Sequence, residues 1–181
     1  MSRKPVKIAI AYDFDGTLAP GNMQEHSFIP RLGLDNDAFW AESNGMSKTH
    51  DMDDILAYMQ LMLKKAAEKQ IPVTRKALLD HGKEIRFFEG VESFFDLINQ
   101  YAAQKNVIIE HHIISSGVRD IIKGTSIARH FKNIFASGYV FDNKDVAIWP
   151  ALAINYTNKT QYLFRINKGI ELIPYENTHN L

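Results

Sequence analysis

The sequence predicts a Rossmann-like α/β fold: a parallel sheet with crossover helices, interrupted after its first strand by an inserted helical cap. The apolar run at residues 6–12 passes directly into two carboxylates and a glycine, which is typical of the end of a buried strand. A second β-branched run, at 107–114, ends in the turn sequence Ser-Ser-Gly and precedes another helical pattern. Strands that alternate with helices in this way indicate a parallel sheet.

Composition limits the class of protein. The 181 residues fit one domain or a core with a small insertion, and a hydrophobic content of 45% can build its interior. The 21 basic and 21 acidic residues cancel, which argues against a nucleic-acid or membrane-surface binder. The absence of cysteine excludes disulfides and thiolate chemistry. No segment reaches the ~18 apolar residues of a membrane span, and the N-terminus is a poor signal peptide, so we expect a cytoplasmic protein.

The cap is expected over residues 20–88, between core segments at 1–19 and 89–181. Its expected elements, in order, are a Pro- and Gly-rich loop at 18–34 and helices at 35–45, 52–63 and 74–86. Asp51 is expected to cap the second of these helices. The remaining core elements expected, in order, are a helix at 91–102, a strand at 107–114, a helix from about 118, a strand at 131–136, a hairpin over 139–149 and a last helix at 161–167 that Gly169 closes.

Two carboxylates follow the first strand, Asp13 and Asp15, with the spacing that places both side chains on one face of an extended chain. Asp13 can act as a nucleophile that passes through an aspartyl-phosphate, and Asp15 can protonate the leaving group and then activate water. Neighbouring carboxylates also attract a hard cation such as Mg²⁺. The hydroxyl of Thr17 would hold the loop or a carboxylate, and Thr17 is also a candidate for phosphate binding. An ordinary Asp-Gly turn is the structural alternative.

A hydroxyl is expected at the end of the second strand, that of Ser115, where it can donate a hydrogen bond to a phosphate oxygen. The amides of Ser116 and Gly117 are expected at a helix N-terminus, where an anion is stabilised. A helix-capping role for Ser115 is the structural alternative.

Two lysines are candidates for neutralising the charge of a phosphoryl group. Lys159 opens the last predicted helix, whereas Lys168 lies near its end, where a lysine complements the helix dipole.

The sequence DFDGT at 13–17 resembles the first motif, DxDxT, of the haloacid dehalogenase-like (HAD) superfamily of phosphohydrolases. In this resemblance Ser115 matches the family's second motif and Lys159 its third. The resemblance implies a capped Rossmann-like core and a Mg²⁺ ion held by the Asp13 carboxylate and the Asp15 backbone carbonyl. The layout of 113–141 is similar to the phosphoserine phosphatase-like branch. The dehalogenase branch is disfavoured, because its members lack the second aspartate.

The family's fourth, acidic motif is missing from this sequence. The acids after Lys159 are Glu171 and Glu176, and neither follows an apolar strand. We therefore expect the N-terminal part of a longer enzyme or a degenerate member. Without the family's neighbouring strand, the first strand would expose an apolar edge, which predicts self-association.

The combined prediction is Mg²⁺-dependent hydrolysis of a small phosphorylated metabolite, with no nucleic-acid or membrane partner. The alternative is a truncated or degenerate HAD domain that binds a phosphorylated ligand or a protein partner without efficient catalysis. It rests on the missing acidic motif.

Other polar residues have open or structural explanations. His111 and His112 are neighbours in a predicted strand and point to opposite faces, which favours structural use over a shared metal. Arg119 can reach a phosphate or face solvent. In the cap, four residues can contact a substrate, and the sequence does not rank them: Glu25, His26, Arg31 and Trp40.

Overall fold

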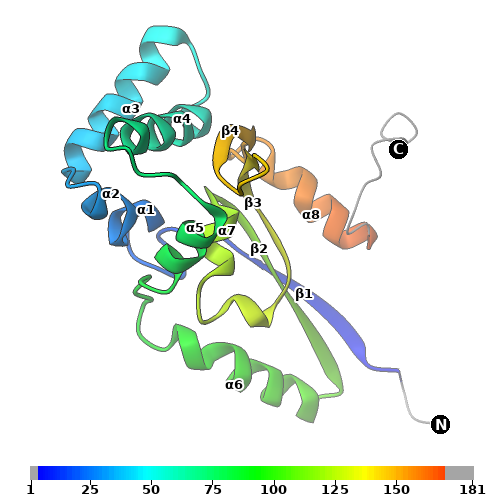
Figure 1. The fold of residues 1–181 in the computed structure, drawn as a ribbon. Helices are drawn as coiled ribbons and strands as arrows, with labels where there is room; N and C mark the ends of the chain where they lie inside the picture. Colours follow the sequence, from blue (N-terminus) through cyan, green and yellow to red (C-terminus); the bar gives the residue numbers. More distant parts are fainter. Residues whose placement is uncertain (1–3, 170–181) are drawn as a thin grey trace.

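The computed structural model describes residues 4–169, and its four strands form one sheet in the order β1-β2-β3-β4 (Figure 1). The strands are β1 (Val6–Tyr12), β2 (Val107–Val118), β3 (Phe131–Phe141) and β4 (Ala147–Leu152). The first three run parallel, and β4 pairs with β3 in the antiparallel direction. The predicted α/β class with a parallel sheet is confirmed, as are the bounds of the first strand.

Two strands are longer than the sequence predicts. β2 continues through the Ser-Ser-Gly sequence to Val118, and its register against β3 shifts at this point. β3 joins the strand predicted at 131–136 to the first arm of the predicted hairpin, which β4 completes. The helix predicted after β2 is correspondingly short, since α7 spans Arg119–Lys123. A 3₁₀ turn at Ala128–His130 leads from it towards β3.

Six helices connect β1 to β2 within the described chain: α1 (Met23–His26), α2 (Phe28–Arg31), α3 (Asn36–His50), α4 (Asp54–Glu68), α5 (Arg75–Gly82) and α6 (Val91–Gln104). The loop predicted at 18–34 is wrong in part, because α1 and α2 lie inside it. Pro30 stands in the first turn of α2, where its missing N–H removes no helix hydrogen bond. The last helix, α8 (Lys159–Lys168), ends at Gly169 with a φ of 67°, as predicted.

The predicted cap of the α4 helix is wrong. Asp51 has a φ of 49° and ends α3, a left-handed position that a short polar side chain tolerates. Asp53 begins α4 instead, since its carboxylate accepts hydrogen bonds from the N–H groups of Ile55 and Leu56. Asp51 and Asp53 are only two positions apart, so an aspartate is available both at the end of α3 and at the start of α4.

Helices α1 to α4 gather at the end of the sheet towards which β1 runs (Figure 1). The main hydrophobic core is continuous across this junction, because it includes Phe14 after β1, Met59 on α4 and Ile113 on β2. The division into a core at 1–19 and 89–181 and a cap at 20–88 stays a prediction.

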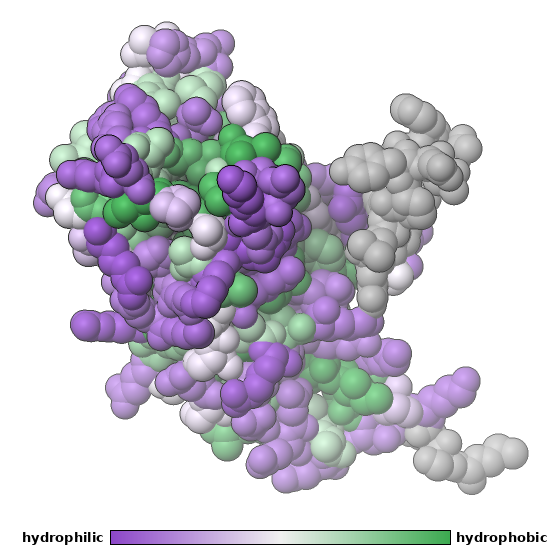
Figure 2. All heavy atoms as spheres, in the orientation of Figure 1, coloured by the Kyte–Doolittle hydropathy of each residue, from purple (hydrophilic) through white to green (hydrophobic). Residues whose placement is uncertain are grey.

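The surface is mostly hydrophilic on the face shown in Figure 2, with a hydrophobic area where α4 approaches β4. In the described sheet β1 is an end strand, and Val6 and Ile8 on it are 60% and 44% exposed. Whether this edge makes the protein self-associate stays a prediction. No helix within residues 4–169 is long and apolar enough to cross a membrane.

Helix α5 packs against α7 backbone to backbone. A Cβ atom placed on Gly82 would lie 2.1 Å from the carbonyl oxygen of Ile121. One placed on Gly124 would lie 1.9 Å from the carbonyl oxygen of Leu79. Neither contact leaves room for a methyl group, so these two glycines set the distance between the helices.

We expect Gly82→Ala and Gly124→Ala each to lower the free energy of unfolding by about 1–3 kcal/mol, since the backbones must separate. Gly45→Ala in α3 is the control, because nothing lies within 4 Å of its Cβ position and alanine favours a helix. Urea denaturation measures all three. Equal effects at positions 45 and 82 would contradict the close packing.

Candidate active site

A tight turn presents the two acids at the carboxyl end of β1. Phe14, between them, is fully buried in the core, which anchors the turn. Gly16 has a φ of 71° and donates its N–H to the carbonyl of Ala19 at 2.8 Å. The carbonyl of Phe14 accepts the N–H of Thr17 at 3.2 Å, and the Thr17 side chain is exposed. The main chain therefore fixes this loop, whereas a holding role for the Thr17 hydroxyl stays a prediction.

The structure brings Lys159 to Asp13. The ammonium Nζ of Lys159 lies 2.5 Å from Oδ2 of Asp13, whose Oδ1 accepts the N–H of Phe14 at 2.8 Å. Lys168 lies at the other end of α8, with its Nζ 5.5 Å from the Phe164 ring. Of the two candidate lysines, Lys159 therefore sits at the acidic turn.

An asparagine-rich loop prepares the position of Lys159. Oδ1 of Asn155 accepts hydrogen bonds from the N–H and hydroxyl of Thr157 and from the N–H of Asn158. The Asn155 amide also donates to Oδ2 of Asp53 at 2.8 Å, and Asp53 begins α4. The sequence analysis missed this link, although Asn at the start of such a loop is a recognisable turn signal.

The last residues of β2 meet Asp15. Oγ of Ser115 is buried and accepts the N–H of Gly117 at 3.0 Å. A Cβ atom on Gly117 would lie 1.9 Å from Cε of Met23 and 3.1 Å from Oδ2 of Asp15, so a larger residue here would displace the Met23 side chain and crowd Asp15. The capping alternative for Ser115 is wrong, because α7 begins after Val118 without a side-chain cap. The helix N-terminus therefore lies beyond the Ser116 and Gly117 amides.

The Asp15 carboxyl can hold a proton near neutral pH. Its burial raises the pKa from 3.8 to about 7. The N–H of Met23, which donates to Oδ1 at 2.9 Å, opposes this shift in pKa, while the carboxylates of Asp13 and Glu25 add to it. A carboxyl with a pKa near neutrality suits both donation and acceptance of a proton.

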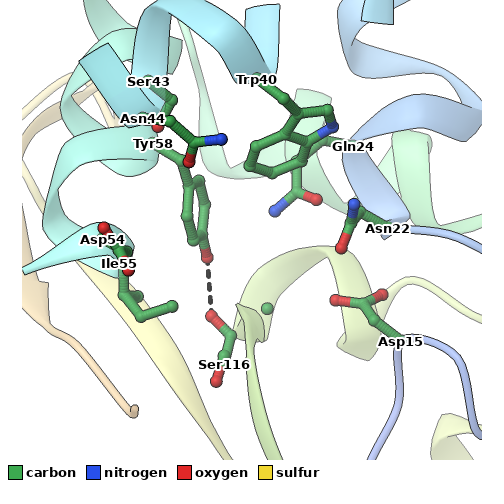
Figure 3. A pocket seen from close by; sticks show the side chains of 11 residues that line it. Asp15, Asn22, Gln24, Trp40, Ser43, Asn44, Asp54, Ile55, Tyr58 and Ser116 are labelled. Atoms are coloured by element: carbon green, nitrogen blue, oxygen red, sulfur yellow. Dashed lines mark hydrogen bonds between the residues drawn. The ribbon is translucent and has the colours of Figure 1, made fainter. Parts of the chain in front are cut away.

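A cavity of about 130 Å³ opens beside Asp15 (Figure 3). Its walls come from the end of β2, at Ser116, and from helices, at Gln24, Trp40 and Tyr58. Oη of Tyr58 donates to the carbonyl of Ser116 at 2.7 Å. α4 is thus joined directly to the end of β2, a link that the sequence does not predict.

Glu25 fixes the wall formed by Trp40. The indole N–H of Trp40 and the side-chain amide of Asn22 each donate to Oε1 of Glu25 at 2.6 Å. The rings of Trp40 and Tyr58 meet edge to face, 5.8 Å apart. Of the four cap residues proposed from the sequence, Trp40 lines the cavity and Glu25 supports it.

The other two cap candidates lie elsewhere. Nε2 of His26 donates to the carbonyl of Pro20, and its Nδ1 accepts the N–H of Arg86. Arg31 pairs with Glu84. Neither lines the cavity among the described residues.

Three further sequence candidates have mainly structural surroundings. Arg119 lies over Gly138 on β3, where its Nη2 would be 2.7 Å from a Cβ atom. His111 contacts the hydroxyl of Tyr12 at 2.9 Å, whereas His112 contacts the side-chain amide of Asn133 at 3.3 Å. The two histidines therefore have separate neighbours.

The Mg²⁺ ion that the resemblance implies would need several oxygen ligands. Both carboxylate oxygens of Asp13 already accept hydrogen bonds, and the Asp15 backbone carbonyl would be the second ligand. No three His, Asp or Glu side chains within residues 4–169 gather into a cluster that can hold a metal. Glu171 and Glu176 lie outside the described residues. The described residues therefore do not fit a complete Mg²⁺ site.

Solved structures of HAD-family hydrolases share this fold. A HAD family hydrolase from Salmonella enterica subsp. enterica serovar Typhi matches 93% of this chain with a TM-score of 0.66 at 13% identity. The chain spans 54% of that protein's length. A phospho-aspartyl intermediate analogue of phosphoserine phosphatase matches 92% of this chain with a TM-score of 0.58 at 13% identity, and 75% of it is covered. The chain therefore has the HAD-like α/β fold.

Sequence comparison finds a relative without an assigned activity. An uncharacterized protein of Borreliella burgdorferi is 28% identical over 193 residues, which cover 93% of this chain and 67% of that protein. No family model matches the chain.

Asp15→Asn should stabilise the protein at alkaline pH, because the folded state raises the pKa of this carboxyl and so disfavours its ionised form. Below about pH 4 the carboxyl is protonated in the folded and the unfolded state, so it does not lower the free energy of unfolding. Above about pH 7 it is ionised in both states, and the destabilisation by the buried charge is complete. We expect a gain of up to about 4 kcal/mol at pH 8 that vanishes near pH 4.

Chemical denaturation at both pH values measures this difference, with Asp51→Asn at an exposed left-handed position as the control. A variant that is less stable than the original protein at pH 8 would show that the Asp15 carboxylate is not strained.

Proposed function

We propose that this chain is a HAD-type phosphomonoester hydrolase in which Asp13 is the nucleophile. One observation carries the proposal: the Asp13 carboxylate lies 2.5 Å from Lys159, in the same turn as Asp15, whose pKa lies near neutrality. A nucleophile, a cation and a proton carrier are the groups that phosphoryl transfer requires. The fold shared with HAD-family hydrolases supports the proposal.

In the first step, an oxygen of Asp13 attacks phosphorus as the bond from phosphorus to the leaving oxygen breaks. Asp15 in its protonated form gives its proton to that leaving oxygen, which departs as an alcohol. Lys159 and the hydroxyl of Ser115 would stabilise the negative charge on the phosphoryl oxygens. The product is a phosphorylated Asp13 and an ionised Asp15.

In the second step, Asp15 accepts a proton from a water molecule that attacks the same phosphorus atom. The bond from phosphorus to Asp13 breaks, which releases inorganic phosphate and restores the Asp13 carboxylate. Asp15 ends the cycle protonated, so atoms and charges balance.

A phosphate-binding domain without catalysis is the second candidate. It is favoured by the lack, within residues 4–169, of a cluster of acidic side chains that could hold a metal. Similarity to the phosphoserine phosphatase-like branch and a requirement for Mg²⁺ are parts of the hydrolase proposal, and the second candidate does not include them.

Release of nitrophenol from p-nitrophenyl phosphate, with and without Mg²⁺, tests the hydrolase proposal. We expect Asp13→Asn to lower kcat by at least ~10³-fold, since an amide is a poor nucleophile, and Asp51→Asn to leave it unchanged. Turnover that survives Asp13→Asn would contradict the proposed role. Phosphate binding without turnover in the unaltered chain would favour the second candidate.

A further inference from the structure

The cavity beside Asp15 contains a buried polar group without a partner. Gln24 is only 1% exposed, and its side-chain amide lies in the cavity between Trp40 and Asn22 (Figure 3). Its Oε1 accepts no hydrogen bond from any residue in the described range 4–169. Because a buried acceptor left unpaired is costly, its position in a cavity points to a ligand that supplies an N–H or O–H donor.

The charges around the cavity disfavour an anionic group. Asp15 and Asp54 line it, and no Lys, Arg or His does so among the described residues. The lysine of the site, Lys159, is paired with Asp13 outside this lining. A carboxylate or a second phosphate entering the cavity would therefore meet the Asp54 carboxylate and find no cation.

The aromatic walls are fixed by hydrogen bonds that use both of their polar hydrogens. The indole N–H of Trp40 is used by Glu25, and the hydroxyl of Tyr58 is used by the Ser116 carbonyl. The cavity has a volume of about 130 Å³ and opens to solvent, so it has room for a short group.

We propose that this cavity receives the leaving alcohol of the substrate and that Gln24 determines its specificity. The alcohol is short, carries an amine or a further hydroxyl that donates to Oε1 of Gln24, and bears no negative charge. Amino-alcohol and short polyol phosphates belong to this class, whereas phosphorylated amino acids do not. The inference rests on the proposed phosphomonoester hydrolysis.

Three esters that differ by one group at a time test the proposal: ethyl phosphate, phosphoethanolamine and phosphoserine. The second adds an amine to the first, and the third adds a carboxylate to the second. We expect kcat/KM for phosphoethanolamine to exceed both others at least about tenfold, because a site with an unpaired polar group discriminates strongly against an analogue that leaves it unpaired.

Gln24→Leu removes the amide at similar size. We expect the ratio of kcat/KM between phosphoethanolamine and ethyl phosphate to fall towards one in this variant. Gln104→Leu on the exposed end of α6 is the matched control and should keep the original ratio. The series on the unaltered protein tests the proposal even if Gln24→Leu does not fold.

Equal rates for the three esters, or a preference for phosphoserine, would overturn the specificity inference and leave the hydrolase proposal standing. No phosphate release from any ester, p-nitrophenyl phosphate included, would contradict the hydrolase proposal. In that case saturation-transfer NMR with ethanolamine decides about the cavity. Binding that Gln24→Leu abolishes would support the inference, and absence of binding to the unaltered chain would overturn it.

Discussion

The parallel pairing of β1 with β2, in the register that sets Tyr12 opposite Ile113, is the constraint on which the site depends. The two strands run parallel, so the acidic turn after β1 and the last residues of β2, Ser115–Gly117, meet at the same edge of the sheet. A shift of one residue would turn the buried side chains of β2 to the opposite face. Asp15 approaches Gly117 so closely that a Cβ atom there would lie 3.1 Å from its Oδ2.

Helix α4 connects the rest of the site to this edge. Its first turn holds Asn155, and through it the loop that carries Lys159. Further along, Tyr58 bonds to the Ser116 carbonyl, and the main chain at Met59 accepts the hydroxyl of Tyr139 from β3 at 3.0 Å. Displacement of α4 would therefore disturb the loop that carries Lys159 and the end of β2 together. The raised pKa of Asp15 depends on the burial that this arrangement provides.

The sequence was sufficient for features that depend on neighbouring residues. An apolar run followed by DFDGT predicts the first strand and its turn, and Gly169 predicts the end of α8. It was insufficient where residues distant along the chain decide the outcome. The bond from Asn155 to Asp53 spans 102 positions, and the unpaired Oε1 of Gln24 emerges only when three helices, the acidic turn and the end of β2 surround a cavity. No local pattern carries that information.

The central claim, that Asp13 is the nucleophile, is tested most directly by mass spectrometry of the acid-quenched Asp15→Asn protein after incubation with p-nitrophenyl phosphate. Nitrophenolate leaves without a proton from Asp15, whereas water still needs a base to attack the intermediate, so the phosphorylated enzyme should accumulate. The account predicts one phosphoryl group on the peptide that contains Asp13. A phosphoryl group on another residue, or nitrophenol release without any covalent phosphoryl group, would contradict it.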